Sequence, residues 1–222
     1  MQTDHAVPEP EIAASPAVER LLGLLASGKP RILVALAGLP GAGKSTWAAR
    51  WAEAVDRCAG AGQLQVLGMD GFHLPRAALA RMPDPALALT RRGAPWTFDA
   101  AALRDRLLAL RDGRQAVAWP DFQHDVGDPV EGVFVVPPAT RLVLVEGLYL
   151  LHQGWELEGV FDERWFLDVP PGVARGRLVA RHQRAWGISG VEAEARIDAN
   201  DGLNSALVWA DRSLADWLVP EQ

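Results

Sequence analysis

The chain has 222 residues, of which 49% are hydrophobic and 23% are charged, proportions that argue against a disordered protein or a coiled coil. Its formal net charge of -6 argues against nucleic acid as a partner, because a phosphate backbone is bound by a cationic surface. No run approaches the roughly 18 apolar residues of a membrane span, and the first residues lack the pattern of a signal peptide. One cysteine, Cys58, permits no internal disulfide, so we expect a cytoplasmic globular protein with no membrane partner.

The first predicted elements are a helix, a strand and a second helix. Ser15 as an N-cap, Pro16 and one apolar face indicate a helix at about 16–27. The run RILVALA at 31–37 is typical of a strand buried on both faces of a parallel sheet. A glycine-rich turn follows, then helix-like sequence at 44–59 and a strand at 64–69 that ends at Asp70.

Helices and strands continue to alternate in the rest of the chain. Asp99 opens a helical pattern that ends at Gly113, and strand candidates follow at 115–119, 141–145 and 164–169. A helix at about 171–187 is interpreted as a lid, and a helix at 191–199 and a last strand at 215–219 come after it. This alternation predicts an α/β domain spanning 1–222, with a doubly wound, mainly parallel sheet and helices on both faces. Two long stretches, 70–98 and 120–132, are interpreted as irregular functional loops.

A phosphate-binding motif lies between the first strand and its helix. The string GLPGAGKS at 38–45 matches G-x-x-x-x-G-K-[ST] in the strand-turn-helix context that the P-loop requires. Its glycines let backbone N–H groups surround phosphates, Lys44 bridges phosphate oxygens, and Ser45 offers a hydroxyl to Mg²⁺. The motif predicts a P-loop NTPase fold that binds ATP through Gly38, Pro40, Gly41, Ala42, Gly43, Lys44, Ser45 and Thr46.

A P-loop alone does not make a kinase, so other residues must indicate the reaction. No N-K-x-D string is present, which disfavours a GTPase. Asp70, at the end of a strand, is the best candidate for a general base, and Glu146 is a candidate Mg²⁺ ligand beside Ser45. Arg177, Arg181 and Arg184 share one helical face and fit a lid over phosphates, although a solvated basic face has the same spacing. The predicted catalytic residues are Asp70, Lys44, Arg177 and Arg181.

The two long loops carry residues suited to binding a phosphoryl acceptor. The strings RRGAPWTFD at 91–99 and PDFQH at 120–124 mix cations, aromatic rings and hydrogen-bonding groups. The candidate acceptor contacts are Asp70, His73, Arg92, Phe122 and His124, and a structural role for either histidine is left open. Asp121 is a second choice for the base.

The strings GLPGAGKS, MDGFH, RRGAPWTFD, PDFQH, LVEGLYLL and NDGLNSALV together resemble the superfamily of uridine kinase, phosphoribulokinase and bacterial pantothenate kinase. The resemblance is closer to bacterial nucleoside/nucleotide kinase-like proteins, some of them described as fructose-transport kinases. It implies that Asp70 is the catalytic base, that the P-loop serves ATP and Mg²⁺, and that Asn204 lies near the adenine. Uridine kinases have a D-S-F-Y-like string where this chain has DGFH, so the resemblance does not imply uridine itself.

The sequence therefore predicts an ATP-dependent kinase that phosphorylates a hydroxyl group of a small molecule, such as a nucleoside, sugar, sugar acid or pantothenate-like compound. A regulatory nucleotide-binding protein, or an ATPase without an acceptor, is the alternative. A homodimer is left open.

Overall fold

The computed structural model describes residues 15–123 and 125–220. Residues 1–14, where we expect no signal peptide, and His124, a candidate acceptor contact, lie outside the described residues.

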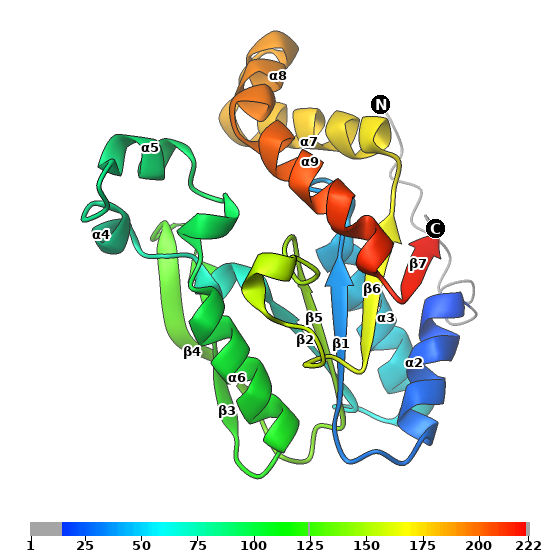
Figure 1. The fold of residues 1–222 in the computed structure, drawn as a ribbon. Helices are drawn as coiled ribbons and strands as arrows, with labels where there is room; N and C mark the ends of the chain where they lie inside the picture. Colours follow the sequence, from blue (N-terminus) through cyan, green and yellow to red (C-terminus); the bar gives the residue numbers. More distant parts are fainter. Residues whose placement is uncertain (1–14, 124, 221–222) are drawn as a thin grey trace.

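The centre of the fold is a five-stranded sheet in the order β2-β5-β1-β6-β7 (Figure 1). Every neighbouring pair in it is parallel. The strands are β1 (Ile32–Ala37), β2 (Leu64–Gly68), β5 (Leu142–Gly147), β6 (Glu163–Asp168) and β7 (Trp217–Pro220). In the register of the sheet Glu146 is level with both Leu36 and Gly68. The segments that follow β1, β2 and β5 therefore begin side by side at one edge, where open α/β sheets bind ligands.

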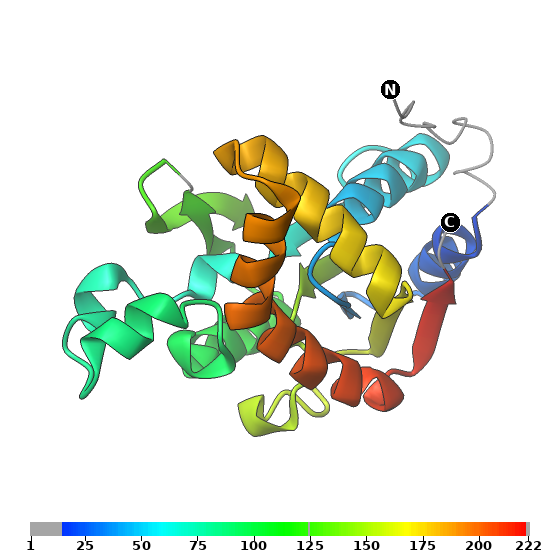
Figure 2. The same cartoon turned by 90° about the horizontal axis from the view of Figure 1, so that it is seen from above.

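Helices cover both faces of this sheet, which explains why every residue of β1 is buried. Helices α2 (Pro16–Ala26) and α3 (Lys44–Ala59) lie on one side, and α6 (Ala100–Asp112) lies on the other (Figure 2). Trp51 of α3 is fully buried and meets Trp165 of β6 edge to face, with ring centroids 6.2 Å apart. The faces of α3 and α6 belong to one continuous apolar core.

Three further helices lie above the carboxyl ends of the strands (Figure 1). They are α7 (Pro171–Trp186), α8 (Gly190–Ala199) and α9 (Asp201–Ala210). Helix α7 matches the helix predicted at about 171–187, whose role as a lid stays a prediction, and α8 matches the helix predicted at 191–199. Helix α9 and the short helix η4 (Asp211–Leu214) were not predicted. A single residue, Asn200, separates α8 from α9, too short a break for a periodic pattern to reveal.

The prediction of an irregular loop at 120–132 is wrong. Strands β3 (Val117–Gln123) and β4 (Asp128–Val136) form an antiparallel hairpin, a second sheet separate from the first. The strand expected at 115–119 is therefore longer than predicted and belongs to this hairpin. Pro120 lies at the register shift between Trp119 and Asp121, a bulge position where a proline is tolerated in a sheet.

The stretch 70–98 is also more regular than predicted. It contains the 3₁₀ helices η1 (Met69–Phe72) and η2 (Pro95–Thr97), and the α-helices α4 (Arg76–Leu79) and α5 (Pro85–Thr90). Asp84 caps α5, with its carboxylate accepting a hydrogen bond from the Leu87 amide at 2.9 Å. A further short helix, η3 (Gln153–Trp155), follows β5. Such helices span one or two turns, so their sequences carry too few residues to show a period.

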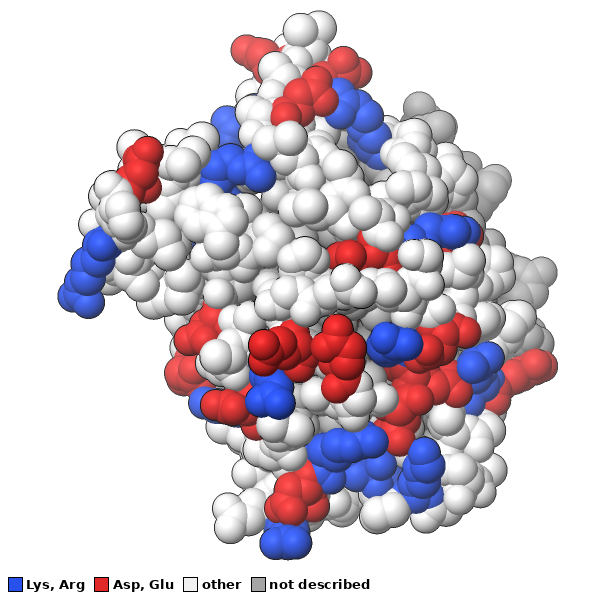
Figure 3. Space-filling view, in the orientation of Figure 1, with Lys and Arg blue, Asp and Glu red and all other residues white. Residues whose placement is uncertain are grey.

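Within the described residues, no helix is both long and apolar enough to span a membrane. Acidic side chains run across the middle of the face drawn in Figure 3, below α7, α8 and α9.

Candidate active site

The P-loop joins β1 to α3, and its conformation requires glycine at two positions. Gly41 and Gly43 have φ values of 81° and 93°, a region that side chains with a Cβ atom rarely adopt. A Cβ atom at Gly41 would also overlap the carbonyl oxygen of Ala174. Helix α7 therefore lies directly against the P-loop.

Lys44 is held inside this loop, with 8% of its surface exposed. Its Nζ donates hydrogen bonds to the carbonyl oxygens of Gly38 at 2.9 Å and Leu39 at 3.2 Å. Burial lowers the pKa of Lys44, and the carboxylates of Glu146 and Asp70 oppose that effect. These two acids therefore help to keep a buried ammonium charged at the place where phosphates would be bound.

Ser45 and Glu146 form the candidate metal pair. The Ser45 hydroxyl donates a hydrogen bond to Oε1 of Glu146 at 2.8 Å. Burial raises the pKa of Glu146, while Lys44 and Ser45 act in the opposite direction. A hydroxyl and a carboxylate fit Mg²⁺, which takes one or two protein oxygens and completes its shell with phosphates and water. The described residues contain no cluster of three or more His, Cys, Asp or Glu that could hold a metal ion.

Asp70 lies in η1, directly after β2, and its position depends on the hairpin. Trp119 Nε1 donates to the Gly68 carbonyl at 2.9 Å, and the Trp119 ring meets Phe72 edge to face at 4.9 Å. A Cβ atom at Gly71 would overlap the backbone of Pro120. Strand β3 therefore packs on η1 so closely that only glycine fits between Asp70 and Phe72.

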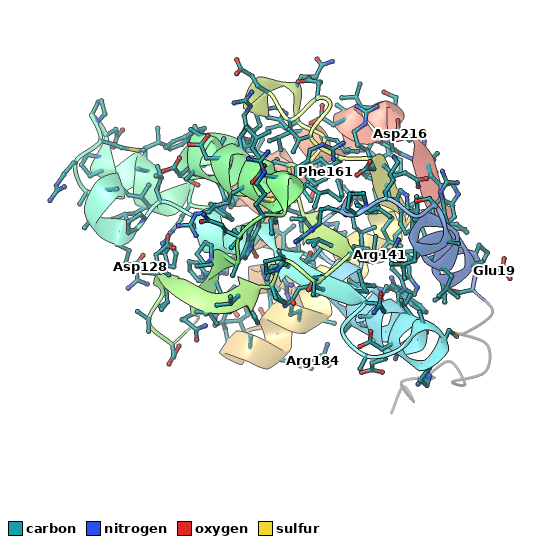
Figure 4. The ribbon with its side chains drawn as sticks, turned by 90° about the horizontal axis from the view of Figure 1, so that it is seen from below. Glu19, Asp128, Arg141, Phe161, Arg184 and Asp216 are labelled. Carbon is teal, nitrogen blue, oxygen red and sulfur yellow. The ribbon has the colours of Figure 1, made fainter. Side chains whose placement is uncertain are left out.

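One cavity of about 590 Å³ collects most of the predicted site residues. It is lined by the P-loop, by Asp70 and Glu146, and by the three lid arginines of α7. Figure 4 labels Arg184 on this helix and Asp128 on the hairpin. The sequence left two interpretations of the arginine face open, and the structure places Arg177, Arg181 and Arg184 on the wall of the cavity.

The candidate acceptor residues lie at the other end of the cavity. The His73 ring packs against Phe98 and Phe122, with centroid distances of 4.0 and 4.9 Å. His73 Nδ1 is 2.8 Å from the backbone oxygen of Asp70. His73, Arg92 and Phe98 line the cavity, whereas Phe122 is not among the described residues that line it and packs behind the His73 ring. Asp121, the second choice for the base, accepts a hydrogen bond from Gln123 at 3.0 Å and is not among the described residues that line the cavity.

No protein-family model matches the chain, but it is similar to individual known proteins. The "ATP-dependent kinase-like protein notR'" of Aspergillus versicolor is 40% identical over 163 residues, which cover 68% of this chain and 93% of that protein. The "Putative uridine kinase C227.14" of Schizosaccharomyces pombe is 38% identical over 185 residues, covering 80% and 78%. The solved structure of a "putative fructose transport system kinase" from Silicibacter sp. TM1040 matches with a TM-score of 0.81 and 34% identity, covering 93% of this chain and 98% of that one.

The chain belongs to the uridine kinase-like family of ATP-dependent P-loop kinases. The predicted fold, the use of ATP and the assignment as a phosphotransferase are thereby confirmed.

Two predicted site residues of this kinase make their main contacts within the protein. Asn204 is 2% exposed; its Oδ1 accepts from Arg91 at 3.2 Å and its Nδ2 donates to the Gly93 carbonyl at 3.1 Å. Arg92 donates to the carbonyl oxygens of Gly127 at 2.6 Å and Leu74 at 3.0 Å, and to Asp128 at 2.6 Å. Both residues line the cavity, but both also hold its walls together.

Sequence reasoning missed several residues around the cavity, above all Asp201, Asn200 and Arg91. Asp201 lines the cavity, and burial raises its pKa while His182 and nearby arginines act to lower it. Asn200 donates to the Arg92 carbonyl at 3.0 Å. The sequence did contain a signal, because RRGAP and NDGLN were recognised as unusual strings. Their mutual contact joins residues more than 100 positions apart, which no local pattern reveals.

Proposed function

We propose that this kinase transfers the γ-phosphoryl group of MgATP to a hydroxyl group of an uncharged small molecule, such as a nucleoside, a sugar or another polyol. The observation that carries the proposal is that one cavity holds Lys44, the Ser45–Glu146 pair and Asp70 at adjoining strand ends. A kinase needs a phosphate cradle, a metal-side acid and a residue that accepts the hydroxyl proton.

The transfer divides among these residues in a simple way. The P-loop amides and Lys44 bind the phosphates, and Ser45 and Glu146 provide oxygen ligands for Mg²⁺, which when bound offsets phosphate charge. The Asp70 carboxylate orients the acceptor hydroxyl and takes its proton while the new O–P bond forms. The bond from the γ-phosphorus to the bridging oxygen breaks, and ADP leaves with those electrons. Arginines of α7 stabilise the charge on the transferring group.

The preference for an uncharged acceptor rests on Arg92, the guanidinium at the acceptor end of the cavity. Its side chain is 14% exposed and makes three hydrogen bonds to Gly127, Leu74 and Asp128. Burial alone would raise the pKa of Asp128, but hydrogen bonds from Arg76 and Arg92 lower it. The Asp128 carboxylate therefore neutralises Arg92, and an acceptor carboxylate or phosphate placed there would lack a cationic partner.

Among the described residues, the other cationic groups that line the cavity belong to Lys44 and to helix α7. A bound triphosphate needs those charges itself, because phosphoryl transfer is catalysed mainly by positioning and charge stabilisation. A cytoplasmic location is part of this proposal, because Cys58 is a free, exposed cysteine and such thiols suit a reducing compartment.

A matched-pair screen of ADP release tests the proposal. Each neutral candidate is paired with a charged counterpart: ribose with ribose 5-phosphate, uridine with uridine monophosphate, glycerol with glycerate, and pantothenol with pantothenate. We expect turnover with a neutral compound and a much lower kcat/KM with its charged partner. Turnover restricted to charged partners would contradict the acceptor class. ADP release at the same rate in every well, acceptor or none, would show an ATPase instead of a kinase.

A further inference from the structure

Residues 91–93, which we name the RRG loop, connect two parts of the site that would contact different substrates. Its Arg92 and Gly93 line the cavity at the acceptor end. Through Arg92 the loop is fastened to the tip of the hairpin at Gly127 and Asp128. Five further hydrogen bonds run to α8, α9 and the residue between them.

Five hydrogen bonds join the RRG loop to α8, α9 and the residue between them. Arg91 Nη1 donates to the carbonyl oxygens of Ala199 at 3.1 Å and Asn200 at 3.5 Å, and Nη2 donates to Asn204 Oδ1 at 3.2 Å. Asn200 and Asn204 in return donate to the backbone oxygens of Arg92 and Gly93, at 3.0 and 3.1 Å. Arg91 thus places a cation at the carboxyl end of α8, where unpaired carbonyls and the helix dipole favour positive charge.

The Gly93 carbonyl joins a third part of the site. Besides Asn204, it accepts a hydrogen bond from the Tyr149 hydroxyl at 2.7 Å. Tyr149 is fully buried and stands three residues after Glu146, the candidate metal ligand. One backbone oxygen therefore connects the acceptor loop, the segment that carries Glu146, and α9.

These polar contacts matter because α8 and α9 have few apolar anchors. The buried residues of α8 are Ala193 and Ile197, and those of α9 are Asn204 and Val208. Arg175 of α7 and Asp198 of α8 form an ion pair at 2.6 Å, so the helix that carries the lid arginines is linked to α8. If α7 shifts toward bound phosphates, α8 and α9 would move with it, because weakly anchored elements move most easily. Their hydrogen bonds to the RRG loop would then move the loop as well.

We infer that Arg91 is a positioning residue that couples the nucleotide half of the site to the acceptor half. Nucleotide binding fixes the positions of α7, α8 and α9. The hydrogen bonds of Arg91, Asn200 and Asn204 then fix the position of the RRG loop at the acceptor end. The inference rests on the proposed function for its kinetic consequence, but its structural consequence requires nucleotide binding alone.

Hydrogen exchange read by mass spectrometry tests the coupling, with a non-hydrolysable ATP analogue and Mg²⁺ as the probe. In the wild type we expect slower exchange in peptides covering the P-loop, α7 and also residues 91–98. In Arg91→Met the P-loop should still be protected while protection of 91–98 is lost. Arg81→Met removes an exposed arginine between α4 and α5 and should behave as the wild type.

Protection confined to the P-loop and α7 in the wild type, or unchanged protection of 91–98 in Arg91→Met, would overturn the inference. Asn200→Ala removes one hydrogen bond, that to the Arg92 carbonyl. This variant takes the place of Arg91→Met if Arg91→Met does not fold. It should weaken protection of 91–98 in part, and an unaltered pattern would again refute coupling. No acceptor is needed, so these results stand whether or not the acceptor screen succeeds.

A kinetic measurement separates positioning from simple stability once the screen has supplied an acceptor. Coupled sites typically change each other's affinity by about 5- to 150-fold. In the wild type, the KM for ATP should therefore decrease by about 5- to 150-fold as the acceptor approaches saturation. In Arg91→Met that dependence should vanish while kcat at saturation of both substrates changes less. If Arg91→Met lowers kcat while its KM for ATP still depends on acceptor concentration as in the wild type, the positioning role is refuted.

Discussion

Replacing Asp70 with asparagine tests the part of the mechanism that makes the protein a kinase. Asparagine keeps the size of the side chain but does not accept the hydroxyl proton. His73 contacts the backbone oxygen of Asp70 at 2.8 Å, not its carboxylate, so Asp70→Asn leaves that contact in place. The substitution therefore removes a charge and a base without removing the local structure that positions them.

The magnitude follows from the role of a general base. Such a group contributes about 10²- to 10⁴-fold in rate, or roughly 3–5 kcal/mol of transition-state stabilisation. Nucleotide affinity should change little, because the Asp70 carboxylate does not belong to the phosphate cradle and acts on Lys44 only as one of two nearby carboxylates, of which Glu146 remains. We thus expect a steep loss of kcat without a loss of binding.

The assay combines steady-state ADP release with a direct measurement of nucleotide affinity by tryptophan fluorescence. Trp47 packs beside Gly43 of the P-loop and is 8% exposed, which makes it a suitable probe. Asp121→Asn is the matched control, because Asp121 lies in β3 of the hairpin that packs on η1, and its carboxylate accepts a hydrogen bond from Gln123. The assignment of the base would be refuted if Asp70→Asn lowers kcat by less than about tenfold, or if Asp121→Asn lowers kcat as much as Asp70→Asn does.

Two other predictions concern the metal pair and the hairpin contact. Burial raises the pKa of Glu146, so its carboxylate takes up a proton as pH falls through that raised pKa. The Mg²⁺ concentration for half-maximal activity should then rise. Glu146→Gln should need more Mg²⁺ at every pH and should lose this pH dependence. A Cβ atom at Gly71 would overlap the Pro120 backbone, so Gly71→Ala should lower the free energy of unfolding by about 1–3 kcal/mol in denaturant titrations. Gly23→Ala, in the open surroundings of α2, should instead raise it by up to about 1 kcal/mol, and equal effects at both glycines would contradict the packing argument.

The elements predicted correctly from sequence are those whose signal is local. The run at 31–37 is apolar because β1 is covered on both faces, and the glycines after it are needed by the backbone itself. Lys44 and Ser45 follow at fixed spacing, so strand, loop and helix could be assigned together. The caps Ser15 and Asp99 accept hydrogen bonds from Val18 and Ala102, respectively, as their residue types suggested.

The hairpin was missed because one of its strands carries little burial signal. The first seven of the nine residues of β4 read DPVEGVF, and exposed positions run from Val130 to Val135. Proline, glycine and acids in such a stretch look like a loop. The hairpin is held instead by Trp119 and Val136, which are fully buried, and that burial comes from contact with a distant part of the chain.

The roles of Arg92 and Asn204 could not be read from the sequence for a related reason. A pattern shows which residue types are present, but it does not show whether a guanidinium will meet a substrate or an aspartate 36 positions away. The same holds for Asn204, which bonds to residues more than 110 positions earlier. Their proposed substrate contacts stay predictions, and their structural contacts are the finding.

The distribution of charge connects the sequence to the chemistry of the site. An acidic chain with a net charge of -6 needs a local site if it is to hold a triphosphate. The cavity supplies one, because five basic side chains but three acidic ones line it among the described residues. Four of the five basic groups, Lys44 and the arginines of α7, gather where the P-loop amides also point. The fifth, Arg92, is neutralised by Asp128 at the other end. The cavity is thus cationic where a phosphate donor would bind and has no excess positive charge where an acceptor hydroxyl would meet the Asp70 carboxylate, an asymmetry that favours one direction of binding for each substrate.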